Sequence, residues 1–237
     1  MSDRPETTEP KQRWRLIVAR AADAPAAAQR ETSDAWTAAI EACGVPLTYA
    51  DGDRPRPRIS FGAPLPIGMA AEGELIDVVL CERWPVWRVR EALAPYVPPG
   101  WRLIDLVDVW LAGPALAGRV AAADYRIELA GEVAPEVLER QAQQLLAASS
   151  IPRERDKGGS RVAYDLRPLV IDVRVDRGPP TVVRTRTRFH PELGTGRPEE
   201  VLAALADAAG RPLEAATIVR ERLLLVDDLD RAGSRLD

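Results

Sequence analysis

The order of predicted strands and helices occurs twice along this chain of 237 residues, and that repeat limits the folds available to it. Short apolar or alternating runs predict strands, and apolar residues at three- and four-residue spacing predict helices. Each half has the order strand, helix, strand, strand, helix, strand. Because two successive βαββαβ units form the tandem ferredoxin-like arrangement, we expect an α+β fold with antiparallel sheets and helices on one face of each sheet.

The expected boundaries follow from where this order begins, pauses and ends. We expect a disordered N-terminus at residues 1–12, a first ferredoxin-like half at 13–111, a small-residue joint at 112–122, a second ferredoxin-like half at 123–226 and a fraying polar tail at 227–237. The expected strands are 14–18, 47–50, 58–61, 74–80, 101–110, 125–129, 162–175, 181–189 and 217–226. The expected helices are one capped at Thr32 or Ser33 and ended at Gly44, and those at 85–96, 135–148 and 198–209, with a charged loop at 153–161.

The composition is typical of a folded protein, because 46% of the residues are hydrophobic and 29% are charged. A formal net charge of -4 argues against strong, indiscriminate binding to nucleic acid, although it leaves room for a local basic surface. No apolar run approaches the roughly 20 residues that span a membrane, and the polar N-terminus lacks the apolar core of a signal peptide. We expect Cys43 and Cys81 to be small buried residues rather than a disulfide, and therefore expect a cytoplasmic protein without membrane association.

The segment RPRPR at residues 54–58 holds three arginines on a backbone stiffened by two prolines. Proline lacks an N–H donor, so Pro55 and Pro57 cannot lie in a central strand, and the segment must form a sheet edge or a loop. One interpretation is that the arginines present their guanidinium groups to phosphate or carboxylate with little loss of entropy. The other is that proline and charge protect a sheet edge from strand addition. The first interpretation gives a candidate binding site made of Arg54, Arg56, Arg58, Tyr49, Ser60 and Phe61.

A second group of arginines lies in a predicted hairpin at residues 171–189. Because side chains alternate along a strand, four arginines and two aspartates share one face, which leaves that face at +2. Cross-strand ion pairs on a wet sheet face are one interpretation. A weak surface for an anionic ligand such as an RNA backbone is the other, although no aromatic residue alternates with these arginines. The candidate residues are Arg184, Arg186 and Arg188.

The sequence predicts no catalytic residue, no cofactor and no metal site. His190 is the only histidine, and without a positioned nucleophile we expect it to be a turn residue. The glycines at 194–198 precede a helix but lack the spacing of a phosphate-binding loop. The aspartates of the C-terminal tail lack the spacing of a calcium-binding loop.

Three separated stretches resemble one protein family. GVPLTYADGDRPRPRISFGAPLPIG, YDLRPLVIDVRV and GRPEEVLAAL occur in the same order as blocks of the radical-SAM-linked protein family, a domain of unknown function. The resemblance covers residues 13–226. It implies an accessory role beside a radical SAM enzyme, in RNA modification or processing.

The chain also departs from the pattern of that family. The family has a Ser-His-Leu-Asp block before its first helix, where this chain has Ala28, Gln29, Arg30 and Glu31. The glycine-and-basic turn that normally ends the first strand is replaced by residues 21–28. Both departures favour a binding or scaffold role over catalysis.

The leading hypothesis from the sequence is a non-enzymatic accessory module. Its expected partners are RNA and a radical SAM enzyme, with the arginines positioning phosphate and Tyr49 and Phe61 buttressing them or stacking. One alternative is a metal-independent endoribonuclease of the tandem ferredoxin-like type, which would need a general base. The other is a protein–protein scaffold without RNA contact. The sequence leaves the oligomeric state open.

Overall fold

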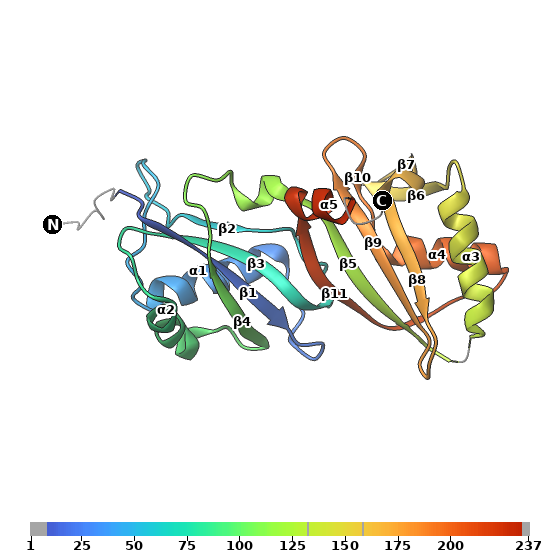
Figure 1. Ribbon diagram of the computed structural model, residues 1–237, viewed down its shortest axis with the longest axis horizontal. Coiled ribbons are helices and arrows are strands. Elements are labelled where there is room, and N and C mark those ends of the chain that lie inside the picture. Colours follow the sequence, from blue (N-terminus) through green and yellow to red (C-terminus); the bar gives the residue numbers. More distant parts are fainter. Residues whose placement is uncertain (1–8, 132, 158, 234–237) are drawn as a thin grey trace. The chain divides into compact units, whose positions relative to one another are not determined.

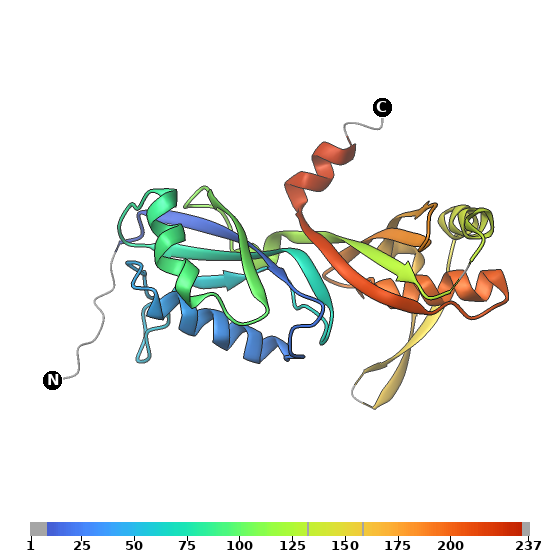
Figure 2. The same ribbon diagram turned by 90° about the horizontal axis from the view of Figure 1, so that it is seen from below.

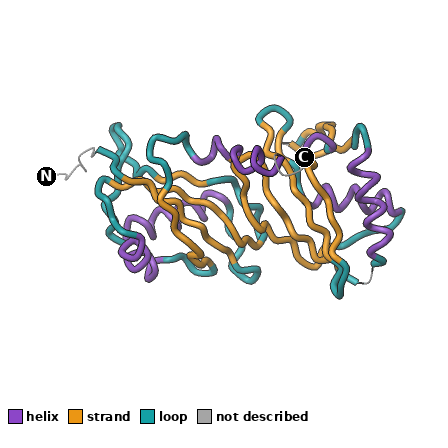
Figure 3. Tube along the Cα trace, in the orientation of Figure 1, coloured by secondary structure: helices purple, strands orange, loops and turns teal. Residues whose placement is uncertain are grey.

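The computed structural model describes residues 9–131, 133–157 and 159–233 of the chain (Figure 1). The chain divides into two compact units, unit 1 at Met1–Val120 and unit 2 at Ala121–Asp237, and the boundary lies inside the expected joint. Each unit is α+β, with a mostly antiparallel sheet and packed helices (Figure 3). No helix within the described residues combines the length and apolar character needed to cross a membrane.

Unit 1 has an antiparallel sheet whose strands lie in the order β2, β3, β1, β4. Strand β1 pairs with both β3 and β4, while β2 pairs with β3. In chain order the elements are β1 (Gln12–Arg20), α1 (Gln29–Ala42), β2 (Ile59–Phe61), β3 (Ala70–Leu80), α2 (Val86–Leu93), η1 (Ala94–Tyr96), β4 (Trp101–Asp108) and η2 (Leu116–Arg119).

The core of unit 1 lies between the two helices and one face of the sheet. Trp14, Leu16 and Val18 alternate along β1 and point to the same cluster as residues of α1 and α2, so both helices cover the same sheet face. The fully buried ring of Trp36 meets Trp101 edge to face, with ring centroids 5.8 Å apart. Burial of each such large apolar side chain stabilises the fold by about 1.5–3 kcal/mol.

The other face of the unit 1 sheet carries a buried ionic cluster, which consists of Arg13, Arg15 and Asp77. The Asp77 side chain is 1% exposed and accepts hydrogen bonds from Arg13 Nε at 2.8 Å and Arg15 Nε at 2.7 Å. The guanidinium of Arg13 also donates to the carbonyl oxygens of Gly113 and Pro114. The cluster therefore fastens the segment that follows β4 to the sheet.

Unit 2 has β5 next to both β9 and β11, and β9 also pairs with β8 and with the short β10. Strands β6 and β7 form a separate two-stranded sheet. In chain order the elements are β5 (Val120–Leu129), α3 (Pro135–Ala147), β6 (Pro152–Lys157), β7 (Ser160–Asp165), η3 (Arg167–Leu169), β8 (Val170–Asp176), β9 (Val182–His190), β10 (Gly194–Thr195), α4 (Pro198–Ala209), β11 (Ala215–Leu225) and α5 (Val226–Gly233).

The core of unit 2 lies between α3, α4 and one face of its sheet. Ile127 of β5 and Val183 of β9 lie opposite each other and belong to the same buried cluster as Leu138 of α3 and Leu205 of α4. The helix α4 ends at Gly210, whose φ of +64° is a left-handed conformation that glycine adopts without strain. Charged residues, which alternate with the apolar ones along β5 and β9, lie on the opposite face of the sheet.

Several elements differ from the sequence-based expectations. The expected charged loop at 153–161 lies in the β6–β7 hairpin, which Figure 2 shows in yellow projecting from unit 2. The sequence of β6, PRERDK, has no apolar alternation, and the hairpin is formed by backbone pairing of β6 with β7. The expected strand at 162–175 is interrupted by η3, where Pro168 breaks the ladder and Leu169 is buried.

The ends of the units also differ. Helix α1 begins at Gln29, earlier than expected, because the carboxylate of Glu31 accepts a hydrogen bond from the Ala28 N–H at 2.7 Å. The expected strand at 47–50 forms only isolated bridges. The expected polar tail begins with helix α5 instead of fraying at once. Residues 1–8 of the expected N-terminal segment lie outside the described residues, and β1 already begins at Gln12.

Candidate functional site

The three arginines of the RPRPR segment lie on a hairpin that is attached to the edge of the unit 1 sheet. We call residues 47–58 the arginine hairpin. Its two arms are joined by hydrogen bonds from Arg58 N to Thr48 O at 2.8 Å and from Ala50 N to Arg56 O at 2.9 Å. The hairpin is anchored to β3 because Val79 N donates to Arg58 O at 3.1 Å. The segment is therefore a loop at a sheet edge, as the two prolines require.

The guanidinium groups of Arg54, Arg56 and Arg58 face solvent, since all three residues are exposed. Within the described part of the chain, none of the three has a hydrogen bond or ion pair from its side chain. Asp51 and Asp53 lie at the tip of the same hairpin and are also exposed, which reduces its net charge to +1 (three arginines minus two aspartates). The arginines are thus available to an outside anion, in a hairpin of small net charge.

The other three residues of this candidate site, Tyr49, Ser60 and Phe61, are less exposed than the arginines. Tyr49 forms an isolated β-bridge with Pro57. The side chains of Tyr49 and Phe61 both pack against the unit 1 core. Burial, followed by the nearby charge of Glu41, raises the pKa of the Tyr49 hydroxyl, so it stays protonated at neutral pH. Ser60 lies directly opposite Asp77 in the β2–β3 ladder. Tyr49 and Phe61 are therefore placed to buttress the hairpin, because their rings pack inward.

The arginines of the second candidate group mostly have partners within unit 2. Arg184 donates to Asp176 Oδ2 at 2.6 Å and to Glu221, and Arg186 donates to Asp124 Oδ1 at 2.7 Å. The hydrogen bonds that Arg184 donates to Glu221 and then to Asp176 raise the pKa of Arg184 further above its usual range. Arg188 is exposed, and no side-chain partner occurs for it in the described ranges. Arg184 and Arg186 therefore match the interpretation of cross-strand ion pairs on a wet sheet face.

The acidic partners come from strands outside the predicted hairpin. Asp124 belongs to β5, Glu221 to β11, and Arg222 of β11 also donates to Asp124 Oδ2 at 2.7 Å. Burial alone would raise the pKa of Asp124, but hydrogen bonds from Arg186 and Arg222 outweigh it and hold that pKa below its ordinary value. A surface cavity of ≈ 170 Å³ lies here, and its lining combines both signs of charge. The only sequence signal was the alternation of charge with apolar residues in β5.

No cluster of catalytic or metal-binding type accompanies these surfaces among the described residues. His190 lies at the end of β9, where its Nδ1 accepts hydrogen bonds from the backbone N–H of Glu192 at 3.2 Å and Leu193 at 3.1 Å. This geometry assigns it to a turn. In the described ranges, no three His, Cys, Asp or Glu side chains lie close enough to hold a metal ion.

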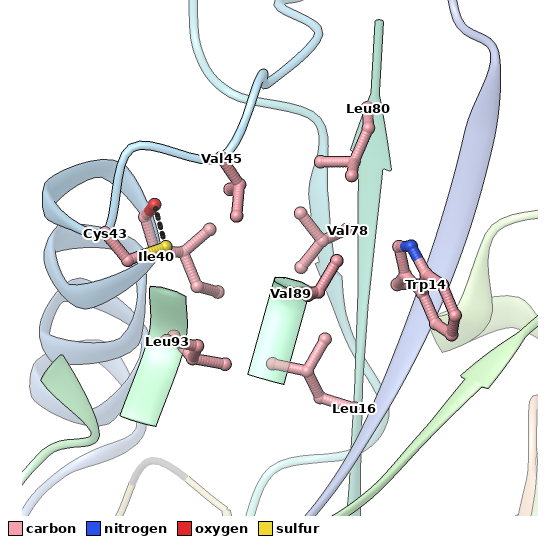
Figure 4. Close-up of a pocket in the computed structure, with 9 residues that line it drawn as sticks. All are labelled: Trp14, Leu16, Ile40, Cys43, Val45, Val78, Leu80, Val89 and Leu93. Atoms are coloured by element: carbon pink, nitrogen blue, oxygen red, sulfur yellow. Dashed lines mark hydrogen bonds between the residues drawn. The ribbon is translucent and has the colours of Figure 1, made fainter. Parts of the chain in front are cut away.

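A small apolar cavity lies inside the unit 1 core (Figure 4). Its volume of ≈ 10 Å³ is no more than one water molecule needs. Figure 4 shows that its lining is almost entirely apolar, and that the Cys43 thiol already donates to the Ile40 carbonyl at 3.1 Å. Burial raises the pKa of this thiol, which makes it a weak nucleophile. The cavity is therefore a packing gap, and the half-buried Cys43 packs beside it.

The fold and these surfaces define an α+β protein of two units with an exposed arginine hairpin. The chain belongs to the family described as "Uncharacterized protein conserved in bacteria (DUF2344)", whose model matches residues 13–201. No curated protein matches the sequence. Solved structures give matches, one of which is a chain of the "Crystal Structure of a Cbf5-Nop10-Gar1 Complex", with 11% identity and a TM-score of 0.47. That match covers 87% of this chain and 48% of the other chain, and a similarity of this size supports no conclusion about function.

Proposed function

We propose that this protein is a non-catalytic accessory module that binds RNA and acts beside a radical SAM enzyme in RNA modification or processing. The observation that carries the proposal is the exposure of Arg54, Arg56 and Arg58, without an ion pair to any described carboxylate. Guanidinium groups form strong, charge-assisted hydrogen bonds with phosphate. The link to a radical SAM enzyme is supported by the resemblance of three sequence blocks.

The fold proposed for each unit is ferredoxin-like, and the strand order supports this. Unit 1 has the chain order β1, α1, β2, β3, α2, β4, and its sheet order is β2, β3, β1, β4. Unit 2 follows the same plan with β5, α3, β8, β9, α4 and β11, and carries the β6–β7 hairpin as an insertion. Because folds host many functions, the proposal depends on the arginine hairpin rather than on this likeness.

The rigid backbone of the hairpin makes it suited to phosphate binding. Pro55 and Pro57 fix their φ angles, and the arms are joined by backbone hydrogen bonds, so little backbone entropy is lost when the arginines are engaged. Tyr49 and Phe61 hold the hairpin on the core. The weak net charge of the hairpin predicts modest affinity and a clear dependence on salt.

The test is a triple substitution, Arg54→Gln, Arg56→Gln and Arg58→Gln, in the full chain. We expect RNA affinity to fall by about tenfold or more, and the slope of log affinity against log salt to flatten by about 2 for three lost phosphate contacts. The measurement is fluorescence anisotropy with a labelled 20-nucleotide RNA at several salt concentrations. The control variant changes the exposed residues Arg30, Arg140 and Arg211 to glutamine, which removes the same charge elsewhere.

Three results would overturn the proposal. Equal loss in the test and control variants would mean that only net charge matters. Absence of RNA binding by the unaltered protein, together with retention of a protein partner, would favour a scaffold. Metal-independent cleavage of the RNA, lost on His190→Ala, would identify a nuclease.

A further inference from the structure

We infer that the RNA bound by the arginine hairpin is single-stranded, and that Trp87 stacks on one of its unpaired bases. This inference rests on the proposed function and extends it to the class of RNA and to a second contact. Trp87 is not part of any predicted site. It is 60% exposed, although tryptophan normally fills a core.

The arginine hairpin and Trp87 both extend from the same end of β3. Val79 N donates to Arg58 O, and two residues later Cys81 N donates to the carbonyl oxygen of Pro46, at the base of the hairpin. Only a short connection then leads to α2, whose first turn contains Trp87. That connection is fixed at Trp84, whose backbone N–H donates to Gln12 Oε1 at 2.8 Å. The arginine hairpin and the Trp87 indole therefore lie at the same end of unit 1.

The indole ring of Trp87 is exposed to solvent, and the helix that carries it is anchored to the core. The helix α2 is held on the core by Val89 and Leu93, which are 5% and 2% exposed. The neighbouring Trp84 already has partners. The guanidinium of Arg88 lies over its ring, 3.7 Å from the centroid, and its Nε1 donates to Glu82. Trp87 is thus the indole of this segment with free surface. A rigid exposed aromatic ring is the support on which nucleic-acid bases stack in single-strand binding proteins.

The charges around Trp87 favour RNA over a protein partner. Three arginines, Arg83, Arg88 and Arg90, and one carboxylate, Glu91, lie within four residues of it in sequence, and Arg90 pairs with Asp105 at 3.2 Å. The centre of a protein interface is depleted in charged residues, so an indole in a segment of net positive charge suits a polyanion better. Duplex RNA keeps its bases stacked inside the helix, where an indole cannot reach them. The matching ligand is therefore a strand with unpaired bases.

The test compares Trp87→Ala with the unaltered protein on a labelled, unstructured 20-nucleotide RNA and on its duplex with the complementary strand. We expect the unaltered protein to prefer the single strand, and Trp87→Ala to weaken single-strand binding by about 5- to 150-fold, the range for loss of one base–aromatic stack. Trp87→Phe should retain most of the affinity, and the salt dependence should stay unchanged in both variants. The control is Tyr96→Ala, since Tyr96 is a 45% exposed aromatic residue that follows α2 in η1.

The outcomes separate this inference from the proposed function. If Arg54, Arg56 and Arg58 prove necessary for RNA binding but Trp87→Ala binds like the unaltered protein, the stacking contact is wrong and the proposed function stands. Equal affinity for duplex and single strand would likewise overturn the inference alone. If Trp87→Ala keeps its RNA affinity but loses a radical SAM enzyme in a pull-down, the indole belongs to a protein interface. If no RNA binds at all, both proposals fail.

Discussion

Replacing Asp77 with asparagine should destabilise unit 1 strongly, because this one carboxylate neutralises two buried arginines. The side chains of Asp77, Arg13 and Arg15 are 1%, 6% and 10% exposed. Asparagine keeps one acceptor oxygen but places an N–H₂ group against guanidinium donors. Removing one partner of a buried ion pair costs about 3–5 kcal/mol, and we expect a loss in the free energy of unfolding of that size.

The assay is urea unfolding followed by tryptophan fluorescence. All six tryptophans lie in unit 1, so this signal reports on that unit alone. Buried Trp14 and Trp36, at 5% and 0% exposure, give the change on unfolding. The control is Asp105→Asn, whose partner Arg90 lies 3.2 Å away at an exposed position, and which should cost less than about 1 kcal/mol.

The result that would contradict this reasoning is a loss below about 1 kcal/mol for Asp77→Asn, comparable to a surface pair. A second variant tests the mechanism. Adding Arg15→Met to Asp77→Asn removes one of the two buried cations, so the double variant should be more stable than the sum of the single losses predicts, by about 1 kcal/mol or more. Additive losses would show that the two residues stabilise the unit independently.

Two further substitutions test unit 2. The pKa of Asp124 is depressed in the folded state, so the Asp124 carboxylate stabilises the fold above the unfolded pKa of about 3.9. That stabilisation is lost as the pH falls through the lower folded pKa. Asp124→Asn should therefore lower the free energy of unfolding at pH 7 more than at pH 2, measured by circular dichroism. Gly196→Ala should destabilise by about 1–3 kcal/mol, because the added Cβ would lie 2.8 Å from the Leu169 carbonyl oxygen and 2.9 Å from Thr187 Cβ. Gly118→Ala, where a Cβ meets nothing within 4 Å, should leave the melting temperature nearly unchanged, and equal effects of the two alanines would contradict the packing argument.

The arrangement of elements was largely predictable from local patterns. Alternation of apolar residues predicted β1, β5 and β9, and three- and four-residue spacing predicted α2 and α3. The α+β class followed from their order. Strand β6 and helix α5 were missed because their sequences, PRERDK and VDDLDRAG, hold few apolar residues, and apolar periodicity is the signal on which the prediction depended.

The candidate sites were predictable to different degrees. The two prolines of the arginine hairpin exclude a central strand wherever the hairpin lies, so its position at an edge was determined locally. The partners of the second arginine group were not, because Asp124 is 62 residues from Arg186 and 98 residues from Arg222 in sequence. The position of Trp84 and Trp87 beside a helix start indicated that one of them is exposed. The sequence did not decide which of the two it is.

The sequence by itself determined which residues alternate on each strand, where proline and glycine interrupt the chain, and therefore the order of strands and helices. Only the tertiary structure decided which strands lie side by side, and with that which arginines are neutralised and which remain exposed to solvent. The physical reason is range: torsional preferences and side-chain alternation act between near neighbours in the chain, whereas an ion pair depends on distance in space.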